Sequence, residues 1–346
     1  MINAGVLGAT GYAGTELVRL LSGHPEVNIK LLVSHSYNGE SYADIYKNYK
    51  QILNMECEEL DVDKVAKACD VVFTALPHGA SKSVIPELYA KGLKIIDLSG
   101  DFRYNDAGVY AEWYGEEHSA PELLDKSVYG LCELHREEIK NTSLVGNPGC
   151  YTTCSILGLA PLLKYGLVET KNIIIDAKSG VTGAGRSLKL QNHFCECNET
   201  MKAYGVATHR HTSEIEQELS LLAGEDIVLS FTPHLVPFNR GILATMYANL
   251  KKDTSLDELL EVFRKFYKDE YFVRVCEKGE LPEIKNVAGS NFVDIGLAVD
   301  KRLGRVIVVS CIDNLVKGAA GQAVQNMNIL FSLDEKTGLN MPGYYI

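Results

Sequence analysis

The stretch INAGVLGATGYAGTELVRLLS, residues 2–22, decides the fold of this chain. It begins as a short apolar strand, and its second half carries leucines, among them Leu17 and Leu21, at the spacing of a helix. Between the two lies GATGYAG, residues 8–14, with the spacing G-x-x-G-x-x-G in place of the more common G-x-G-x-x-G. A strand, a glycine-rich turn and a helix in this order are typical of the first unit of a dinucleotide-binding domain.

Strand and helix patterns continue to alternate after this unit. Residues 28–36, 70–79 and 93–102 contain the short apolar runs of buried strands, and residues 81–91 have the pattern of a helix between two of them. Strands that alternate with helices are joined by crossovers, which make neighbouring strands parallel. The sequence therefore predicts an α/β fold with a Rossmann-type, doubly wound parallel sheet.

The pattern changes beyond Cys150, where longer strands and two amphipathic helices, near 213–222 and 255–268, predict an inserted α+β domain with a mixed or antiparallel sheet. The last helical pattern, KGAAGQAVQNMNILFSL, is expected to return to the first domain. We therefore predict one domain made of residues 1–149 plus 318–346 and a second made of residues 150–317.

Composition excludes several classes of function. The chain has 346 residues, a net charge of −11 and 23% charged residues, so its surface is not built to attract nucleic acid or an anionic membrane. No apolar run approaches the roughly 20 residues that span a bilayer, and the N-terminus lacks the pattern of a signal peptide. Nine cysteines, an odd number scattered along the chain, fit reduced thiols in the cytoplasm.

The glycine turn predicts a nucleotide site. Glycines at this place bring backbone N–H groups close to a pyrophosphate at the helix N-terminus, although the same turn can be only a packing device. The residues predicted to hold the cofactor here are Gly8, Thr10, Gly11, Tyr12, Ala13 and Gly14. At the end of the second strand, Ser34 and Ser36 flank His35 where NAD-specific sites usually have an acidic residue. We therefore predict NADP(H).

Residues 146–154, GNPGCYTTC, place Cys150 directly after a Pro-Gly turn, where a strand meets a helix. A cysteine that begins a helix lies near unpaired N–H groups and the positive end of the helix dipole, which lower the pKa of a thiol. The same N–H groups can hold an oxyanion. We predict that Cys150 is a nucleophile; the alternative is an ordinary buried cysteine.

A nucleophilic cysteine needs an acid or base, and the sequence HRHTSEIEQEL offers His209 and His211. Both side chains point to one side if the backbone there is extended. Ser213 and Glu216 have the spacing of a capping box, which predicts that a helix starts directly after this pair. The alternative is a surface turn without a catalytic role.

Other polar groups are candidates for binding an anion or a metal ion. Arg103 and Arg240 follow short strands and could each bind a phosphate or carboxylate, or form a structural ion pair. The glycine-rich loop 179–187 could bind an anion through its amides. The string HFCEC, residues 193–197, together with the two histidines could form a zinc site, but the C-x-C spacing is unusual and no second cysteine pair follows, so we predict no metal.

Taken together, the strings GATGYAGTELVRLL, LPHGAS, DLSGDFR, GNPGCYTT, SGVTGAGR, HRHTSEIEQEL, PHLVPFNRGI and NLVKGAAGQAVQNMN closely resemble the N-acetyl-γ-glutamyl-phosphate reductases, NADPH enzymes of arginine biosynthesis. The resemblance covers residues 3–345. That family is related in fold to aspartate-semialdehyde and glyceraldehyde-3-phosphate dehydrogenases. The resemblance implies reduction of an acyl phosphate to a semialdehyde, with release of phosphate, through a thioester on the cysteine. It also implies a second domain for catalysis and oligomerisation, and a homodimer or homotetramer.

The resemblance also implies roles for single residues. His209 is expected to be the acid/base, with His211 as the second choice. Expected substrate-binding residues are Arg103, for the leaving phosphate, Asn147, and Ser179, Gly180 and Arg240 for the acetylglutamyl end. Asn314 and Gly318 are expected to orient the nicotinamide.

Two alternatives remain at this point. A related acyl-phosphate reductase, of the aspartate-semialdehyde or the one-carbon-longer aminoadipyl type, would use the same machinery. A non-catalytic NADP-binding redox sensor would bind the cofactor without turnover, and the presence of Cys150 with two histidines argues against it.

Overall fold

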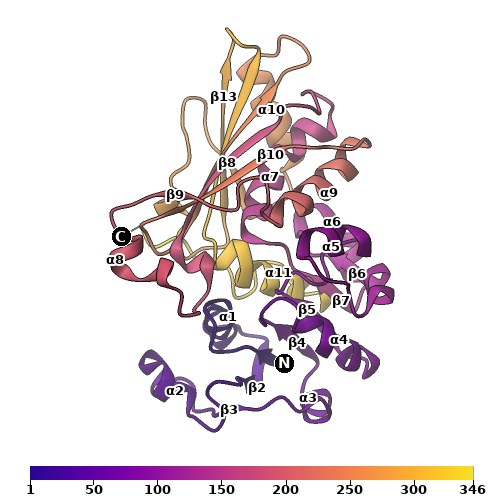
Figure 1. The fold of residues 1–346 in the computed structure, drawn as a ribbon, viewed down its shortest axis with the longest axis vertical. Helices are drawn as coiled ribbons and strands as arrows, with labels where there is room; N and C mark the ends of the chain where they lie inside the picture. Colours follow the sequence, from indigo (N-terminus) through magenta and orange to yellow (C-terminus); the bar gives the residue numbers. More distant parts are fainter. Residues whose placement is uncertain (346) are drawn as a thin grey trace. The chain divides into compact units, whose positions relative to one another are not determined.

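A computed structural model describes residues 1–345, which form two compact units. The first unit contains Met1–Pro148 and Ala319–Asn340, and the second contains Gly149–Gly318 and the chain from Met341 onward. Figure 1 shows the elements of both along the chain. Within residues 1–345, no helix combines the length and the apolar character needed to cross a bilayer.

The first unit is built on a seven-stranded sheet in the order β3-β2-β1-β4-β5-β7-β6, with every neighbouring pair parallel. The strands are β1 Ile2–Leu7, β2 Val27–Val33, β3 Cys57–Glu58, β4 Val71–Thr74, β5 Lys94–Asp97, β6 Ser127–Tyr129 and β7 Leu144–Gly146. The helices are α1 Tyr12–Ser22, α2 Tyr42–Ile45, α3 Val62–Ala68, α4 Ser81–Ala90, α5 Ala107–Tyr114, α6 Cys132–Lys140 and α11 Gly321–Leu330. The predicted doubly wound parallel sheet is confirmed.

The strand order of this sheet identifies where a ligand binds. The chain winds outward from β1 to β2 and β3, and then returns to place β4 on the other side of β1. In such sheets ligands bind at this switch point, beside the carboxyl ends of the strands. The glycine turn after β1 lies there, because Gly8 packs against the backbone of Ala75 just beyond β4.

The second unit has a mixed seven-stranded sheet in the order β12-β13-β14-β11-β8-β10-β9. Its strands are β8 Ile174–Gly180, β9 Lys202–Ala203, β10 Ser230–Val236, β11 Ile242–Asn249, β12 Val273–Val275, β13 Val293–Asp300 and β14 Arg305–Ile312. Its helices are α7 Cys150–Lys164, α8 Phe194–Cys197, α9 His211–Ala223 and α10 Leu256–Phe266. Strands β8 and β10 are parallel, as are β12 and β13, and the remaining pairs are antiparallel.

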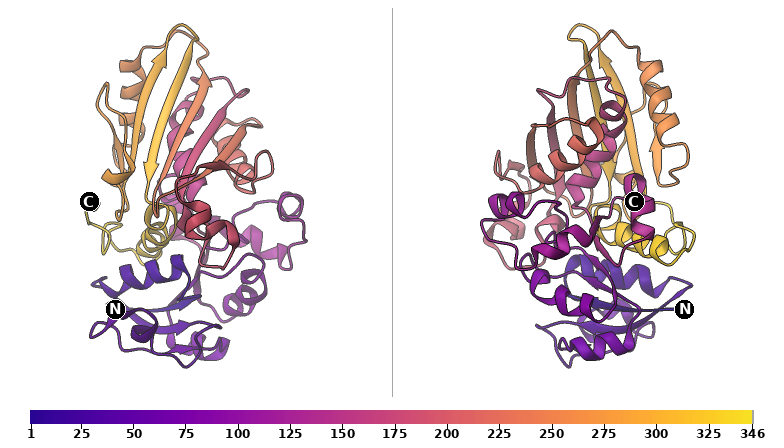
Figure 2. Two further views of the ribbon diagram at one scale, coloured as in Figure 1. Left: turned by 60° about the vertical axis from the view of Figure 1, so that its left-hand side comes forward. Right: turned by 90° about the vertical axis from the view of Figure 1, so that its right-hand side faces the viewer.

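Helix α7 is the centre of the second unit. Every residue from Tyr151 to Leu163 is buried, since the helix packs on β11 and β14 and has α9 beside it (Figure 2). Strand β11 alternates buried and half-buried residues, and Ile242, Ala244 and Met246 lie on its buried face. Helix α7 is therefore held in place by both the sheet and a neighbouring helix.

Two local expectations were wrong. The predicted capping box does not form: α9 begins at His211, its N-cap is Arg210 with no side-chain cap, and the Glu216 carboxylate accepts the Leu229 N–H instead (2.9 Å). The end of the chain also departs from the predicted first domain. From Met341 it follows the second unit, where the Tyr344 N–H donates to the Ala288 carbonyl (2.8 Å).

Candidate active site

The glycine turn of the first unit fits a dinucleotide. A Cβ on Gly14 would lie 2.1 Å from the Gly8 carbonyl oxygen, and one on Gly8, whose φ is +84°, would lie 2.3 Å from the Ala75 carbonyl oxygen. Only glycine allows these close approaches. The N-cap of α1 is Gly11, which offers no side chain to the first amides of the helix, so those amides can face a pyrophosphate.

Three tyrosines that the sequence did not single out support this turn. The Tyr42 hydroxyl donates to the Ala9 carbonyl (3.2 Å), and the Tyr46 hydroxyl donates to the Thr10 carbonyl (2.7 Å). The Tyr49 hydroxyl donates to the carbonyl of Thr15 (3.3 Å), in α1. Tyr42 begins α2, Tyr49 ends the short 3₁₀ helix Lys47–Tyr49, and Tyr46 lies between these two elements. The whole segment reads only as polar in the sequence.

The residues predicted to read the ribose 2′ substituent have different environments. Ser34 is buried, and its hydroxyl is hydrogen-bonded to the Thr10 hydroxyl (2.8 Å). His35 and Ser36 are exposed. Glu58 lies opposite Val33 at the end of neighbouring β3 and is ion-paired with Lys64.

In the second unit, Cys150 is the first residue of α7, as predicted, and it is half-buried. A buried carboxylate holds this end of the helix: Glu214 Oε1 accepts the Gly149 N–H (2.9 Å) and the Thr152 hydroxyl (2.8 Å). Glu214 belongs to α9, the helix that follows the two histidines. The role of Glu214 is not evident from the sequence, because both partners are more than sixty positions away in the chain.

His209 lies in an aromatic cage beside this helix end. Its ring is 5.8 Å from that of Tyr151, 5.5 Å from Tyr204, 5.4 Å from Phe231 and 4.8 Å from His211, centroid to centroid. Burial lowers the pKa of His209 to about 4, and the charge of nearby Arg210 adds to the shift.

The hydrogen bonds of this cage define a tautomer. The N–H of His211 donates to Nδ1 of His209 (3.2 Å), so a neutral His209 carries its proton on Nε2. The Tyr204 hydroxyl donates to that of Tyr151 (3.1 Å). Burial raises the pKa of Tyr204 to about 12, and negative charge on Cys150 contributes to the increase. The thiol therefore lies close to two phenols, and the rings of both phenols pack against His209.

The short π-helix Val316–Ala320, which follows β14, packs against the nucleophile. A Cβ on Gly318 would lie 2.6 Å from Cβ of Cys150, so this position packs directly on the cysteine. Asn314 is buried; its Oδ1 accepts the Gly241 N–H (2.7 Å) and its Nδ2 donates to the Thr182 hydroxyl (3.0 Å). The described contacts of Asn314 thus join two loops of the second unit, and its predicted role at the nicotinamide stays a prediction.

Two predicted substrate residues, Arg103 and Asn147, lie in the first unit and are buried. Arg103 donates from Nε to the Asn147 carbonyl (2.6 Å) and from Nη2 to the Leu98 carbonyl (3.0 Å). The Asn147 amide donates to the Ala319 carbonyl (3.2 Å) and its oxygen accepts from Asn326 (3.0 Å). These bonds fix the loops that carry both residues, and their roles toward substrate stay predictions.

The other predicted substrate residues lie together in the second unit. The Gly180 N–H donates to the Gly241 carbonyl (3.0 Å), which ties the end of β8 to the turn that carries Arg240. Ser179 is buried beside it. Arg240 donates from Nη1 to Asp313 Oδ2 (3.1 Å), and its side chain is 23% exposed. Arg240 thus makes the ion pair considered from the sequence while part of it still reaches the surface.

The considered zinc ligands are not gathered. Among residues 1–345, no group of three His, Cys, Asp or Glu side chains could hold a metal ion. Cys195 is exposed and Cys197 half-buried, whereas the two downstream histidines belong to the aromatic cage described above.

Comparison with known proteins places this architecture in a family. Residues 3–142 match the family model for the NAD binding domain of semialdehyde dehydrogenase, and residues 150–314 match the one for its dimerisation domain. Among solved structures, aspartate semialdehyde dehydrogenase II from Vibrio cholerae has a TM-score of 0.73 at 16% identity, covering 96% of this chain and 98% of that chain. Aspartate semialdehyde dehydrogenase with NADP from Candida albicans has a TM-score of 0.70 at 18% identity, covering 96% and 98%. At such identities the likeness is one of fold.

Curated relatives are far more similar in sequence. The N-acetyl-gamma-glutamyl-phosphate reductase of Acetivibrio thermocellus is 62% identical over 346 residues, and that of Caldicellulosiruptor saccharolyticus is 57% identical over 345 residues. The reductase of Clostridium novyi is 55% identical over 347 residues, and all three alignments cover 100% of both chains. Such identity over the full length shows that this chain belongs to the N-acetyl-gamma-glutamyl-phosphate reductase family of semialdehyde dehydrogenases.

Proposed function

We propose that this enzyme reduces N-acetyl-γ-glutamyl phosphate to N-acetylglutamate 5-semialdehyde with NADPH, releasing phosphate, and that Cys150 carries the acyl group as a thioester. The observation that carries the proposal is the position of Cys150 as the first residue of α7, directly before Tyr151, whose ring packs against that of His209. A helix N-terminus stabilises a thiolate and supplies N–H groups to an oxyanion.

The nucleophile acts in two steps. The Cys150 thiolate attacks the γ-acyl carbon and the carbon–oxygen bond to phosphate breaks, which leaves a thioester. NADPH, when bound, supplies the hydride that reduces this thioester. The alkoxide formed on the sulfur-bound carbon then collapses, the carbon–sulfur bond breaks, and the semialdehyde leaves with the thiolate restored.

His209 assists both steps. Because its Nδ1 accepts the N–H of His211, its Nε2–H is the group that can donate to the thiolate or to a developing oxyanion. Burial keeps its pKa well below neutrality, so the ring is uncharged at neutral pH and carries this single donor in the resting enzyme. His211 contributes through its backbone N–H, which fixes the ring orientation of His209.

NADP(H) is the proposed cofactor of the NAD-binding domain. The N-terminus of α1 and the glycine turn would hold the pyrophosphate. Exposed Ser36 and His35 follow β2 and carry no negative charge against a 2′-phosphate, while the Glu58 carboxylate nearby is paired with Lys64. Ser34 supports the turn through Thr10. The NAD-specific alternative would require a free carboxylate at this place.

We further propose that Arg240 binds the carboxylate of the acetylglutamyl group. Arg103, in the first unit, is proposed to bind the leaving phosphate. Guanidinium groups suit both anions. A reactive thiol requires a reducing compartment, in agreement with the cytoplasmic location expected from the sequence. The dimerisation domain supports a homo-oligomer, and we expect a dimer or a tetramer.

The test is a coupled assay that follows NADPH formation from N-acetylglutamate semialdehyde, NADP⁺ and phosphate. The proposal requires that turnover depends on phosphate and that aspartate semialdehyde is a much poorer substrate. Faster turnover of aspartate semialdehyde, or turnover that is independent of phosphate, would contradict it.

A further inference from the structure

Asp313 is a completely buried carboxylate without a role in the proposed reaction. Its Oδ1 accepts the N–H groups of Leu315 (2.8 Å) and Val316 (3.1 Å). Its Oδ2 accepts the Gly289 N–H (2.7 Å) and Nη1 of Arg240 (3.1 Å). Four donors on one carboxylate fix it in position and compensate its burial.

The backbone of Asp313 leads to the nucleophile. Its carbonyl accepts the N–H of Gly318 (3.0 Å), the residue that packs directly on Cys150. The side chain of Asp313 thus contacts Arg240, the residue proposed to bind the substrate carboxylate. The backbone of Asp313 contacts Gly318, which packs on Cys150. If Arg240 binds the carboxylate and Cys150 attacks the acyl carbon, the distance between the Arg240 guanidinium and the Cys150 sulfur determines the length of the carbon chain in the substrate that fits.

The C-terminal segment packs against the loop that contains Gly289. Residues 341–345, the C-terminal strap, run along the loop 284–290: the Tyr344 N–H donates to the Ala288 carbonyl, and its ring covers Gly289 so closely that a Cβ there would lie 2.2 Å from the ring. Gly289, with φ of +80°, is the residue whose N–H holds Asp313. The strap therefore holds Gly289 in place, and the N–H of Gly289 in turn holds the Asp313 carboxylate.

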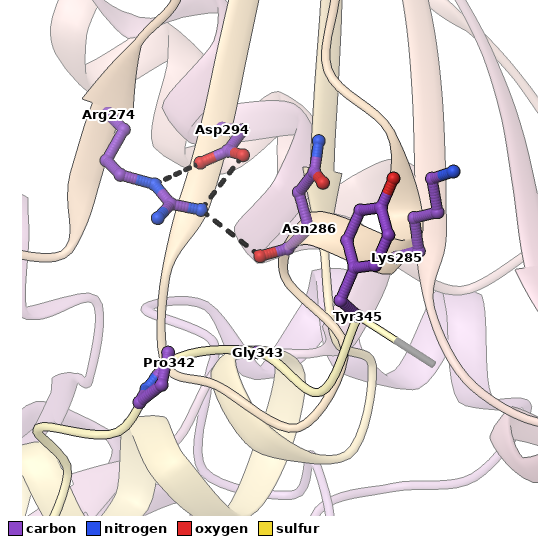
Figure 3. A pocket seen from close by; sticks show the side chains of 7 residues that line it. All are labelled: Arg274, Lys285, Asn286, Asp294, Pro342, Gly343 and Tyr345. Carbon is purple, nitrogen blue, oxygen red and sulfur yellow. Dashed lines mark hydrogen bonds and ion pairs between the residues drawn. The ribbon is translucent and has the colours of Figure 1, made fainter.

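Tyr345, the next residue of the strap, has a different environment. It lines an open cavity of about 370 Å³ with Arg274, which is bound to Asp294, and with Lys285 (Figure 3). The Lys285 ammonium lies 4.7 Å from the centre of the Tyr345 ring. Tyr345 is 63% exposed and does not contact Gly289 in the described network, which makes it a matched control for its neighbour.

We propose that Asp313 is a positioning residue that holds Arg240 at a fixed distance from Cys150, and that the C-terminal strap keeps Asp313 in place through Gly289. The network thereby sets the length of the acyl chain that the site accepts. This inference rests on the proposed role of Arg240.

The first test is Asp313→Asn, which keeps the size of the side chain and one acceptor oxygen. With that oxygen on the Leu315 and Val316 amides, its NH₂ faces the donors of Gly289 and Arg240. We expect KM for N-acetylglutamate semialdehyde to rise roughly tenfold or more, the effect of one lost charge-assisted hydrogen bond, with a smaller change in kcat. KM for NADP⁺ should stay within about twofold.

The same variant tests chain length. Relative to the wild type, the preference for N-acetylglutamate semialdehyde over N-acetyl-aminoadipate semialdehyde, in kcat/KM, should fall at least about fivefold, because one methylene is normally discriminated by roughly 10- to 200-fold. An unchanged KM and preference would overturn the inference, as would an equal rise in KM for NADP⁺, which indicates general damage.

Variants of the strap keep the inference testable if Asp313→Asn does not fold. Tyr344→Ala should raise KM for the semialdehyde roughly three- to tenfold, while Tyr344→Phe and Tyr345→Ala should leave it within about twofold. Equal effects of Tyr344→Ala and Tyr345→Ala would overturn the role of the strap.

Arg240→Gln separates this inference from the proposed function. If it raises KM and Asp313→Asn adds nothing to it in the double variant, Asp313 acts through Arg240. If Arg240→Gln raises KM but Asp313→Asn does not, the positioning role is refuted while the substrate contact stands. If Arg240→Gln leaves KM unchanged, the proposed contact fails, and positioning fails with it.

Discussion

Replacement of Glu214 by glutamine tests whether the start of α7 must be held from α9. Glu214 is buried, and its Oε1 takes both the Gly149 N–H and the Thr152 hydroxyl. Hydrogen bonds to charged groups contribute about 1.5–3 kcal/mol and neutral ones about 0.5–1.5 kcal/mol, so losing the charge on two bonds costs roughly 2 kcal/mol. The thermal midpoint should fall by roughly 4–8 °C.

The effect of Glu214→Gln on catalysis should exceed its effect on stability. Gly149 directly precedes Cys150, and a displacement of about 1 Å in a reacting group can lower a rate by roughly 10²-fold. We therefore expect kcat to fall by about 10- to 100-fold in the phosphate-dependent assay.

The matched control is Glu216→Gln on the same helix. Glu216 accepts one backbone N–H, that of Leu229, and has no described contact with the start of α7. The Glu216→Gln substitution should lower the thermal midpoint by roughly 2–4 °C and change kcat by less than about twofold. Equal losses of kcat in the two variants, or an unchanged kcat in Glu214→Gln, would refute the reasoning.

Three further predictions follow from the histidines and the cofactor site. His209→Ala should lower kcat by about 10² to 10⁴, and a far larger loss in His211→Ala would show that the wrong histidine was assigned. Since burial lowers the pKa of His209 from 6.5 to about 4, the unfolded chain binds its proton first and stability falls as pH decreases through that interval. In thermal melts His209→Gln should reduce this fall, while His24 and His118, whose pKa values burial also lowers, keep part of it. Ser36→Asp should lower the kcat/KM preference for NADPH over NADH at least about tenfold, because like charges ~4 Å apart cost roughly 4 kcal/mol at a protein surface, and an unchanged ratio would show that the 2′-phosphate is recognised elsewhere.

The features that the sequence predicted well are local. The alternation of strand and helix, the glycine turn and the start of α7 at Cys150 each depend on residues within about twenty positions of one another. Periodicity and turn chemistry carry such information.

The features that the sequence did not predict depend on distant partners. Ser34 follows β2, where we predicted cofactor recognition, but it is buried and hydrogen-bonded to Thr10, so exposed Ser36 is the better residue to test. The predicted capping box does not form, because the Glu216 carboxylate accepts a hydrogen bond from the Leu229 N–H instead. Asp313 directly precedes Asn314, and an acidic residue directly after the apolar strand pattern was the available signal in the sequence.

The thioester on Cys150 is tested most directly by omitting phosphate. With N-acetylglutamate semialdehyde and NADP⁺ alone, the wild type should form a burst of about one NADPH per active site and then stop, with the acyl group found by mass spectrometry on Cys150. Cys154 lies in the same peptide but is buried behind it, so fragmentation must distinguish the two sulfurs. Cys150→Ala should bind NADP(H) normally and show neither burst nor acyl group. A burst in Cys150→Ala, or an acyl group on any other residue of the wild type, would contradict the account.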